Sequence, residues 1–419
     1  MKLPIRPVAR LVNGRCWVRP LAVRRFATAQ TSAAASASTN ASSSSASSSA
    51  PNDRVNIIEV GPRDGLQNEK ATIPLSTKIE LIERLARAGL ATIEAGSFVA
   101  PKWVPQMSNS ADILEHILQH RIASPRPISY AFLVPNMKGM DQATVILQQY
   151  PDAFLAEPAP TPASTTSSSS NGGDDNTTSP TSSFKPAVEL AIFAAATESF
   201  SQKNLNCDIA TSLERFRPVI QAAKNAAAAS AGTDTGAGAV ALPPLRVRAY
   251  ISVVLGCPFE GPDVDPRRVA ALATDLLEMG ADTIALGDTT GMGTAPRTKE
   301  LLRCVTAAGI RHEDVGLHFH DTYGQALVNT AVGLEHGIRT FDSAVGGLGG
   351  CPYSPGATGN VATENLVYFL ESLGMDTGVD LDAVADIGAW VTSALGKAHD
   401  SSVGKAVLGA RTRVAAKGP

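Results

Sequence analysis

The stretch LEMGADTIALGD (residues 277–288) combines the end of a helix-like segment, a glycine and a short apolar run. The same order recurs in ARAGLATIEAGS (86–97) and LEHGIRTFDSAV (334–345), with glycine at the fourth place and threonine at the seventh. A glycine just after a helix-like segment is typical of a helix end, where the backbone turns left-handed. The pattern therefore predicts that helices and strands alternate along the chain.

Start signals for helices support this alternation. TKIE (77–80) has the pattern of a capping box, and Asp265 followed by Pro266 suits the first positions of a helix. The glycines expected just after helix ends are Gly89, Gly280 and Gly337.

Short apolar runs of strand character occur at eight places in the sequence. The predicted strands are 55–61, 92–97, 128–134, 188–195, 246–254, 283–288, 315–321 and 340–347. Nearly continuous apolar strands that alternate with helices indicate a parallel sheet. Eight such units predict an α/β fold, the (β/α)8 TIM barrel, with its chemistry at the carboxyl ends of the strands. An open doubly wound sheet is the alternative, but no G-x-G-x-x-G motif opens its first turn.

Polar, low-complexity tracts divide the chain. We expect residues 1–52 to be a presequence followed by a disordered Ser/Ala linker. The catalytic barrel is predicted over 53–395, with low-complexity insertions at 158–183 and 230–244. Residues 396–419 are left as a C-terminal tail.

Charge is distributed unevenly between the first 50 residues and the rest. The first 50 hold seven basic residues and no acidic one, which leaves 29 of the 36 basic residues against all 39 acidic ones. An acidic body does not favour nucleic-acid binding. A basic, acid-free and Ser-rich start is typical of an organelle transit peptide, so we expect the protein to be imported into the mitochondrial matrix. The alternative is that this segment is a basic disordered tail. No run of about 20 apolar residues predicts a membrane span.

The segment HFHDTYGQ (318–325) places two of the seven histidines two positions apart. On a strand, His318 and His320 point to the same side, whereas a helix would turn them far apart. Two imidazoles on one side at the end of a strand suit a metal ion, although a hydrogen-bonded structural pair remains an alternative.

Arg63 and Asp64 follow the first predicted strand in EVGPRDGLQNE (59–69). At that place Asp64 can supply an oxygen ligand, and Arg63 can donate to a developing oxyanion. A surface ion pair is the simpler alternative for the two residues taken alone.

The stretch GGLGGCPYSPGATGNVATE (346–364) holds six glycines in its first fifteen residues. Such a backbone can approach a ligand closely. A flexible linker would explain the glycines, but not the Cys351, Asn360 and Glu364 that accompany them. A thiol beside positive charge can take part in proton transfer.

Two further acids, Glu94 and Asp288, end predicted strands, where they are either site residues or strand-end caps. One rim of the barrel would then gather Arg63, Asp64, Glu94, Asp288, His318, His320 and Asn360. Oxygen and imidazole ligands together fit Mg²⁺ or Mn²⁺. A hard cation beside an arginine suits the stabilisation of an enolate, as in aldol- or Claisen-type chemistry.

Six motifs together resemble the 3-hydroxy-3-methylglutaryl-CoA lyase family. They are EVGPRDGLQNE, SFVAPKWVPQM (97–107), LGCPFEG (255–261), LGDTTGMGT, HFHDTYGQALVNT and GGLGGCPYSPGATGNVATE. The resemblance runs in order from about residue 55 to about 395. It implies a barrel enzyme that cleaves 3-hydroxy-3-methylglutaryl-CoA to acetyl-CoA and acetoacetate, in ketone-body formation and leucine breakdown.

The resemblance also implies roles for residues of this chain. Mg²⁺ or Mn²⁺ would be held by Asp64, His318, His320 and Asn360. Arg63 would stabilise the enolate, Cys351 would transfer a proton, and Glu94, Asp288 and Glu364 would tune the site. Lys397 and Lys405 are weaker candidates for the phosphates of CoA, because LGKAHDSSVGKAV (395–407) departs from the family pattern. We expect an acyl-CoA substrate and a homodimer.

Two alternatives stay open, a related enzyme and a protein of another class. A related synthase would condense an acyl-CoA with a 2-oxo acid, but such synthases usually add a C-terminal regulatory domain, and only residues 396–419 follow the predicted barrel. A barrel that binds CoA esters without catalysis would be expected to lack part of the polar rim.

Overall fold

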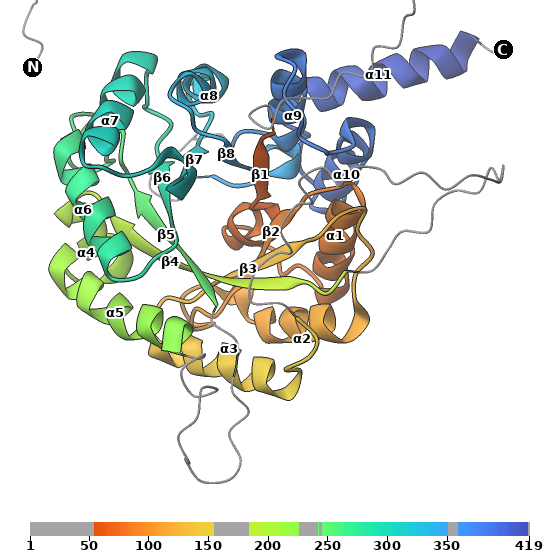
Figure 1. Cartoon of the computed structure of the whole chain (residues 1–419). Coiled ribbons are helices and arrows are strands. Elements are labelled where there is room, and N and C mark those ends of the chain that lie inside the picture. Colours follow the sequence, from red (N-terminus) through yellow and green to blue (C-terminus); the bar gives the residue numbers. More distant parts are fainter. Residues whose placement is uncertain (1–53, 155–183, 226–241, 243–244, 351–358, 418–419) are drawn as a thin grey trace, which may run out of the picture. The chain divides into compact units, whose positions relative to one another are not determined.

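The computed structural model describes residues 54–154, 184–225, 242, 245–350 and 359–417. Eight parallel strands close into a barrel in chain order, so that β1 pairs with both β2 and β8 (Figure 1). The strands are β1 (Asn56–Glu59), β2 (Thr92–Ser97), β3 (Ser129–Leu133), β4 (Ala187–Ala195), β5 (Arg246–Ser252), β6 (Thr283–Asp288), β7 (Val315–Phe319) and β8 (Thr340–Ser343). The predicted (β/α)8 barrel is confirmed, and each strand lies within its predicted range or starts one residue before it.

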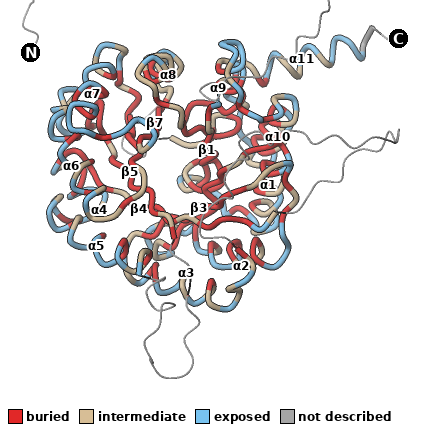
Figure 2. Tube along the Cα trace, in the orientation of Figure 1, coloured by how far each residue is buried: buried red, intermediate tan, exposed pale blue. Residues whose placement is uncertain are grey.

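Helices surround this barrel (Figure 1). They are α1 (Leu75–Arg87), α2 (Ser110–His120), α3 (Met137–Gln149), α4 (Glu198–Leu205), α5 (Ile209–Asn225), α6 (Pro266–Glu278), α7 (Ala295–Ala307), α8 (Ala326–Glu335), α9 (Thr363–Ser372), α10 (Leu381–Ala394) and α11 (Ser402–Lys417). Figure 2 shows the strands mostly buried, while the surrounding helices alternate between buried and exposed positions. Burial of both faces of the sheet explains why the strands read as apolar runs rather than as alternating ones.

Helix ends follow the sequence signals with one exception. The Asp265 side chain accepts a hydrogen bond from Arg267 N at 3.0 Å at the start of α6, as predicted. The three predicted helix-end glycines have left-handed φ angles of +91°, +107° and +85° at Gly89, Gly280 and Gly337. The capping box at Thr77 is wrong: α1 starts two residues earlier, at Leu75, after Pro74. The residue before α1 is therefore proline, whose side chain has no acceptor, and α1 starts without a side-chain cap.

Several predicted segments lie outside the described residues: the presequence and linker, the insertion at 158–183, nearly all of 230–244, and Cys351. The segment predicted as a C-terminal tail contains α11. Arg411 of that helix pairs with Asp382 at 2.7 Å and with Asp386 at 2.8 Å, both on α10. Among the described residues, no helix is both long and apolar enough to cross a membrane.

Because all eight strands are parallel, their carboxyl ends lie on one rim. The residues that follow β1, β6, β7 and β8 therefore come together there. This is the rim on which the sequence placed the candidate site residues.

Candidate active site

Arg63 and Asp64 lie in one wide helical turn, η1 (Gly61–Gly65), directly after β1. The last residue of β1 stabilises the turn, because the Glu59 carboxyl accepts a hydrogen bond from Gly61 N at 2.8 Å. Pro62 suits the start of the turn, since its ring presets a helical φ and it has no N–H to leave unpaired. The turn thus carries both side chains onto the carboxyl-end rim of the barrel.

His318 lies in β7, and His320 follows the end of that strand. Their ring centroids are 5.3 Å apart, as expected for side chains that leave a strand on the same side. One ligand atom each of Asp64, His318 and His320 lies within 4.8 Å of the other two. Within the described part of the chain, no other group of three His, Cys, Asp or Glu side chains is arranged in this way.

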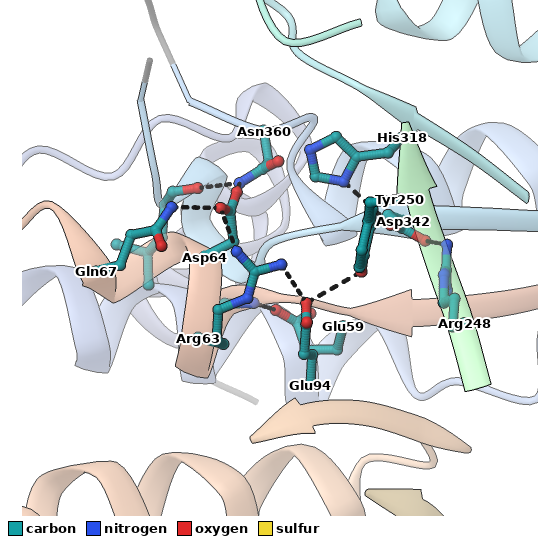
Figure 3. Close-up of polar contacts among 12 residues, drawn as sticks. Glu59, Arg63, Asp64, Gln67, Glu94, Arg248, Tyr250, His318, Asp342 and Asn360 are labelled. Carbon is teal, nitrogen blue, oxygen red and sulfur yellow. Dashed lines mark hydrogen bonds and ion pairs between the residues drawn. The ribbon is translucent and has the colours of Figure 1, made fainter. Parts of the chain in front are cut away.

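Asn360 joins this group from the far end of the glycine-rich stretch. Its backbone pairs with His320, and its Nδ2 donates to Asp64 Oδ2 at 2.9 Å and to Leu348 O at 3.2 Å. All four residues predicted as metal ligands are therefore close together. Figure 3 shows Asn360 and Gln67 on either side of Asp64, and Gln67 Nε2 donates to Asp64 Oδ1 at 2.7 Å.

Unpartnered polar atoms test whether these residues fit a metal ion. His320 Nδ1 and Asn360 Oδ1 are buried and have no hydrogen-bond partner among the described residues. A buried polar atom without a partner is costly, and a coordinated ion would satisfy it. A carboxylate, two imidazoles and an amide oxygen form a plausible donor set for a divalent cation. The residues present fit a divalent metal.

Asp342 in β8, which the sequence analysis missed, supports His318. The imidazole Nδ1 lies 3.0 Å from Asp342 Oδ2, and Arg248 pairs with the other carboxylate oxygen at 2.6 Å. Asp342 and Arg248 are 2% and 4% exposed, so this ion pair is almost free of water. A carboxylate behind an imidazole fixes its tautomer and its orientation toward a metal. The signal was present in the sequence, because Asp342 takes the same place in its repeat as Glu94 does, and Arg248 interrupts an apolar strand.

Glu94 lies within β2 rather than at its end, and it is fully buried. Arg63 donates to it at 2.7 Å and to Asp64 at 2.8 Å (Figure 3). The hydroxyl of Tyr250, a second missed residue, donates to Glu94 at 3.1 Å. The guanidinium also lies 5.6 Å from the centre of the Tyr250 ring. Two carboxylates and an aromatic face thus hold Arg63 in one orientation.

Burial and neighbouring charges set the protonation of the cluster. Burial raises the pKa of Asp64, but the charge of Arg63 and of the two histidines outweighs it and lowers the pKa overall. Burial lowers the pKa of His320 to about 4, so the imidazole is neutral and able to bind a metal at pH 7. Burial would also lower the pKa of His318, but the hydrogen bond and charge of Asp342 raise it. A metal ion bound at His318 would therefore have to displace a proton.

Asp288 ends β6 on the same rim. Its Oδ2 accepts from Gly293 N at 2.9 Å, whereas its Oδ1 is buried and has no partner among the described residues. Burial raises the pKa of Asp288 to about 6. A carboxyl group with this pKa can take up or release a proton near neutral pH.

Among the described residues, Glu364 and Lys397 bond to groups other than the four predicted ligands. Glu364 is fully buried at the start of α9 and accepts hydrogen bonds from Gly346 N, at 3.1 Å to each oxygen. Lys397 pairs with Glu69 at 2.5 Å, and Lys405 is exposed on α11. The structure therefore divides the predicted site residues into a group that converges on Asp64 and a group that lies around it.

Glu59, another residue missed from the sequence, lies directly beneath the rim. Its two oxygens accept from Gly61 N, Val345 N and the hydroxyl of Thr363, at 2.8, 2.9 and 2.6 Å. Complete burial raises the pKa of Glu59 to about 7. This one carboxyl connects the turn after β1 with the turn after β8 and with α9.

The arrangement places positive charge where a substrate oxygen could approach. Arg63 has five N–H donors, and only part of this set is used by Asp64 and Glu94. A divalent cation at the Asp64 cluster would add charge beside it. Such a site can stabilise an enolate while a carbon–carbon bond is made or broken.

Comparisons with known proteins agree with this chemistry. A family model described as HMGL-like matches residues 54–152 and 179–391. Over 356 residues the chain is 45% identical to the 3-hydroxy-3-isohexenylglutaryl-CoA/hydroxy-methylglutaryl-CoA lyase of Pseudomonas aeruginosa, which covers 85% of this chain and 97% of the relative. It is 42% identical over 357 residues to the mitochondrial hydroxymethylglutaryl-CoA lyase of Rattus norvegicus, covering 84% of this chain and 89% of that protein.

Solved structures show the same similarity. The crystal structure of hydroxymethylglutaryl-CoA lyase from Pseudomonas aeruginosa superimposes with a TM-score of 0.68 at 43% identity, covering 85% of this chain and 98% of the other. Sequence and fold therefore match the same group of proteins over most of the chain.

Proposed function

The chain belongs to the HMGL-like family of hydroxymethylglutaryl-CoA lyases, and we propose that the rim around Asp64, His318 and His320 is its catalytic centre. The protein is a carbon–carbon lyase that cleaves 3-hydroxy-3-methylglutaryl-CoA to acetyl-CoA and acetoacetate, as in leucine degradation and ketone-body formation. The observation that carries the assignment of the site is the convergence of three ligand atoms within 4.8 Å, beside a doubly paired Arg63.

We propose Mg²⁺ or Mn²⁺ as the metal, held by Asp64, His318, His320 and Asn360. Hard oxygen donors combined with imidazole favour these ions, whereas Zn²⁺ more often takes cysteine or a third histidine. When bound, the cation supplies positive charge that stabilises negative charge on substrate oxygens.

Cleavage breaks the bond between C2 and C3 of the substrate. The 3-hydroxyl loses its proton and becomes the ketone of acetoacetate, while the electron pair of the broken bond forms the enolate of acetyl-CoA at C2. Arg63 donates hydrogen bonds to the enolate oxygen, and Asp64 and Glu94 keep its guanidinium in place. C2 then takes up a proton, which we assign to the thiol of Cys351, outside the described residues.

Asp288 is the candidate for the proton of the 3-hydroxyl, because its pKa of about 6 leaves it mainly ionised at pH 7 and still basic. Glu364 acts indirectly, through the backbone of Gly346. For the CoA moiety we propose weak contacts of Lys397 and Lys405 with phosphate, since ammonium groups suit an anionic ligand.

We further propose the mitochondrial matrix as the location and a homodimer as the assembly. The first proposal rests on the basic, acid-free start of the chain and on relatives named as mitochondrial. Fusing residues 1–52 to a fluorescent protein tests the first proposal, and light scattering on the purified protein tests the second. A diffuse cytosolic signal or a monomer mass would contradict them.

The main experiment measures acetoacetate released from 3-hydroxy-3-methylglutaryl-CoA by the full chain. We expect release with Mg²⁺ or Mn²⁺, loss after chelation, and recovery when metal is added back. Cys351→Ala should lower turnover and leave the fold intact, because it removes the proposed proton donor. Absence of release from a folded, metal-loaded sample would contradict the proposal, and condensation of acetyl-CoA with 2-oxo acids would then be tested.

A further inference from the structure

Residues 396–404 follow α10 and include the first three residues of α11, and they are hydrogen-bonded to the start of α9. Ser401 Oγ donates to Asn365 Oδ1 at 2.8 Å, and Val403 N donates to the same oxygen at 3.0 Å. Asp400 N donates to Gly346 O at 3.1 Å. The match to the family model ends at residue 391, so this segment lies beyond it.

His399 occupies a slot between two helices in this segment. A Cβ atom on Gly388 of α10 or on Gly404 of α11 would overlap the imidazole, so the ring lies where both residues lack a side chain. The side chain of His399 is only 12% exposed, and its Nδ1 has no partner among the described residues. The slot therefore holds the ring in one place, with Nε2 as its bonded atom.

That atom, His399 Nε2, lies 3.0 Å from Glu364 Oε1. Glu364 is fully buried, and Gly346 N approaches both of its oxygens at 3.1 Å. A carboxylate only accepts hydrogen bonds, so the imidazole must be the donor. Since water does not reach Glu364, His399 is a main source of the hydrogen bonds that stabilise this group.

Gly346 connects this pair to the metal-ligand group. It lies in the short turn η5 (Val345–Gly347) after β8, with a left-handed φ of +68°. The next residue but one, Leu348, presents the carbonyl that accepts from Asn360 Nδ2 at 3.2 Å. The same Nδ2 donates to Asp64 at 2.9 Å. A shift of the turn would therefore move the Asn360 amide.

We propose that His399 is a positioning residue for the rim: by donating to Glu364 it holds the Gly346 turn, and through Leu348 it orients Asn360 toward Asp64. His399 itself contacts none of the four proposed ligands. The proposal rests on the proposed function only for its effect on turnover, because the position of the turn can be measured without substrate.

Two variants with side chains of similar size separate the effect of the hydrogen bond to Glu364 from the effect of filling the slot. His399→Gln keeps a donor near the place of Nε2, and His399→Leu fills the slot without one. His336→Leu serves as the control, because among the described residues the His336 ring, just after α8, bonds only to Val332 O of that helix. Circular dichroism and thermal unfolding are used to check that each variant is folded.

The first measurement is amide hydrogen exchange of the peptide that spans residues 344–350, in metal-free protein. We expect exchange to be ~10-fold faster in His399→Leu, as for loss of a hydrogen bond to a charged group. Mn²⁺ affinity should fall ~3- to 10-fold and kcat ~10-fold at saturating metal, because Asn360 is less well oriented. His399→Gln should restore most of each effect, and His336→Leu should show none.

Equal losses in the two His399 variants would overturn the proposal, because a donor at this place would then restore nothing. Wild-type exchange and Mn²⁺ affinity in His399→Leu would overturn it as well. If wild-type protein releases no acetoacetate, the proposed function fails, yet exchange and Mn²⁺ affinity still decide whether His399 positions the turn.

Discussion

Polar groups act differently on two sides of the rim. On the ligand side, formed by Asp64, His318, His320 and Asn360, side chains approach one another directly. The backbone side is formed by Glu59, Glu364 and His399. There the carboxyl groups accept hydrogen bonds from main-chain N–H groups in turns. In the function proposed above, the ligand side would offer atoms to a metal and substrate, whereas the backbone side holds the turns that carry those residues. We therefore expect substitutions on the ligand side to weaken Mn²⁺ binding strongly and those on the backbone side to weaken it less.

The largest effect is expected for His318→Ala. Removal of one imidazole ligand should weaken Mn²⁺ binding by ~100-fold or more and lower turnover ~10³-fold, since metal stabilisation of charge is worth several kcal/mol. Isothermal titration and a turnover assay measure the two effects, with His336→Ala as the control. Unchanged Mn²⁺ affinity would remove His318 from the ligand side.

The next largest effect is expected for Asp342→Asn, because Asp342 is hydrogen-bonded to His318 of the ligand side. An amide cannot accept from both His318 and Arg248, so one of them loses its partner. We expect Mn²⁺ affinity to fall 10- to 100-fold, the usual range for a group that supports a metal ligand. Stability should fall by about 3 kcal/mol because Arg248 is left buried and unpaired.

Thermal unfolding of Asp342→Asn separates these two effects. Affinity is measured at a temperature where circular dichroism shows the variant fully folded. A loss of stability with less than about a 3-fold change in affinity would show that Asp342 serves Arg248 and not the metal.

The sequence marked the residues that come together on the ligand side more clearly than Glu59 and His399 of the backbone side. Arg63, Asp64 and the two histidines are marked by their place at strand ends, because parallel strands bring those ends to one rim. Glu59 carries no such mark: its partner Val345 is 286 residues away and contributes only a backbone N–H, which any residue type offers. His399 likewise acts through Glu364, 35 residues earlier, and fits only because Gly388 and Gly404 leave space.

On the backbone side, Glu59→Gln tests the cost of a buried carboxyl. The pKa of Glu59 is raised from 4.5 to about 7, so the folded protein keeps the proton over a range in which the unfolded chain releases it. The free energy of unfolding should therefore decrease as the pH rises from 4.5 to 7, on the order of 3 kcal/mol in all, and this contribution should stay constant above pH 7. Glutamine removes that contribution and can still bond to Val345 N and Thr363.

Urea unfolding at pH 5 and pH 8 gives the change in unfolding free energy between the two pH values for each protein. The change in the wild type minus the change in Glu59→Gln measures this contribution. We expect the wild type to lose more stability than Glu59→Gln between the two values. Equal losses would show that Glu59 titrates in the folded protein as it does in the unfolded chain.

The smallest effects are expected for Lys397→Ala and Lys405→Ala, at the outer edge of the backbone side. The Lys397–Glu69 pair is partly exposed, so its loss should change stability by less than about 1 kcal/mol. If the two ammonium groups contact CoA phosphates, each substitution should raise KM by ~3-fold at low salt, leave kcat unchanged, and lose its effect at high salt. The exposed Lys299→Ala on α7 is the control. Unchanged KM in both variants would remove the lysines from the site, and segment 396–404 would then act on the rim only through backbone contacts and His399.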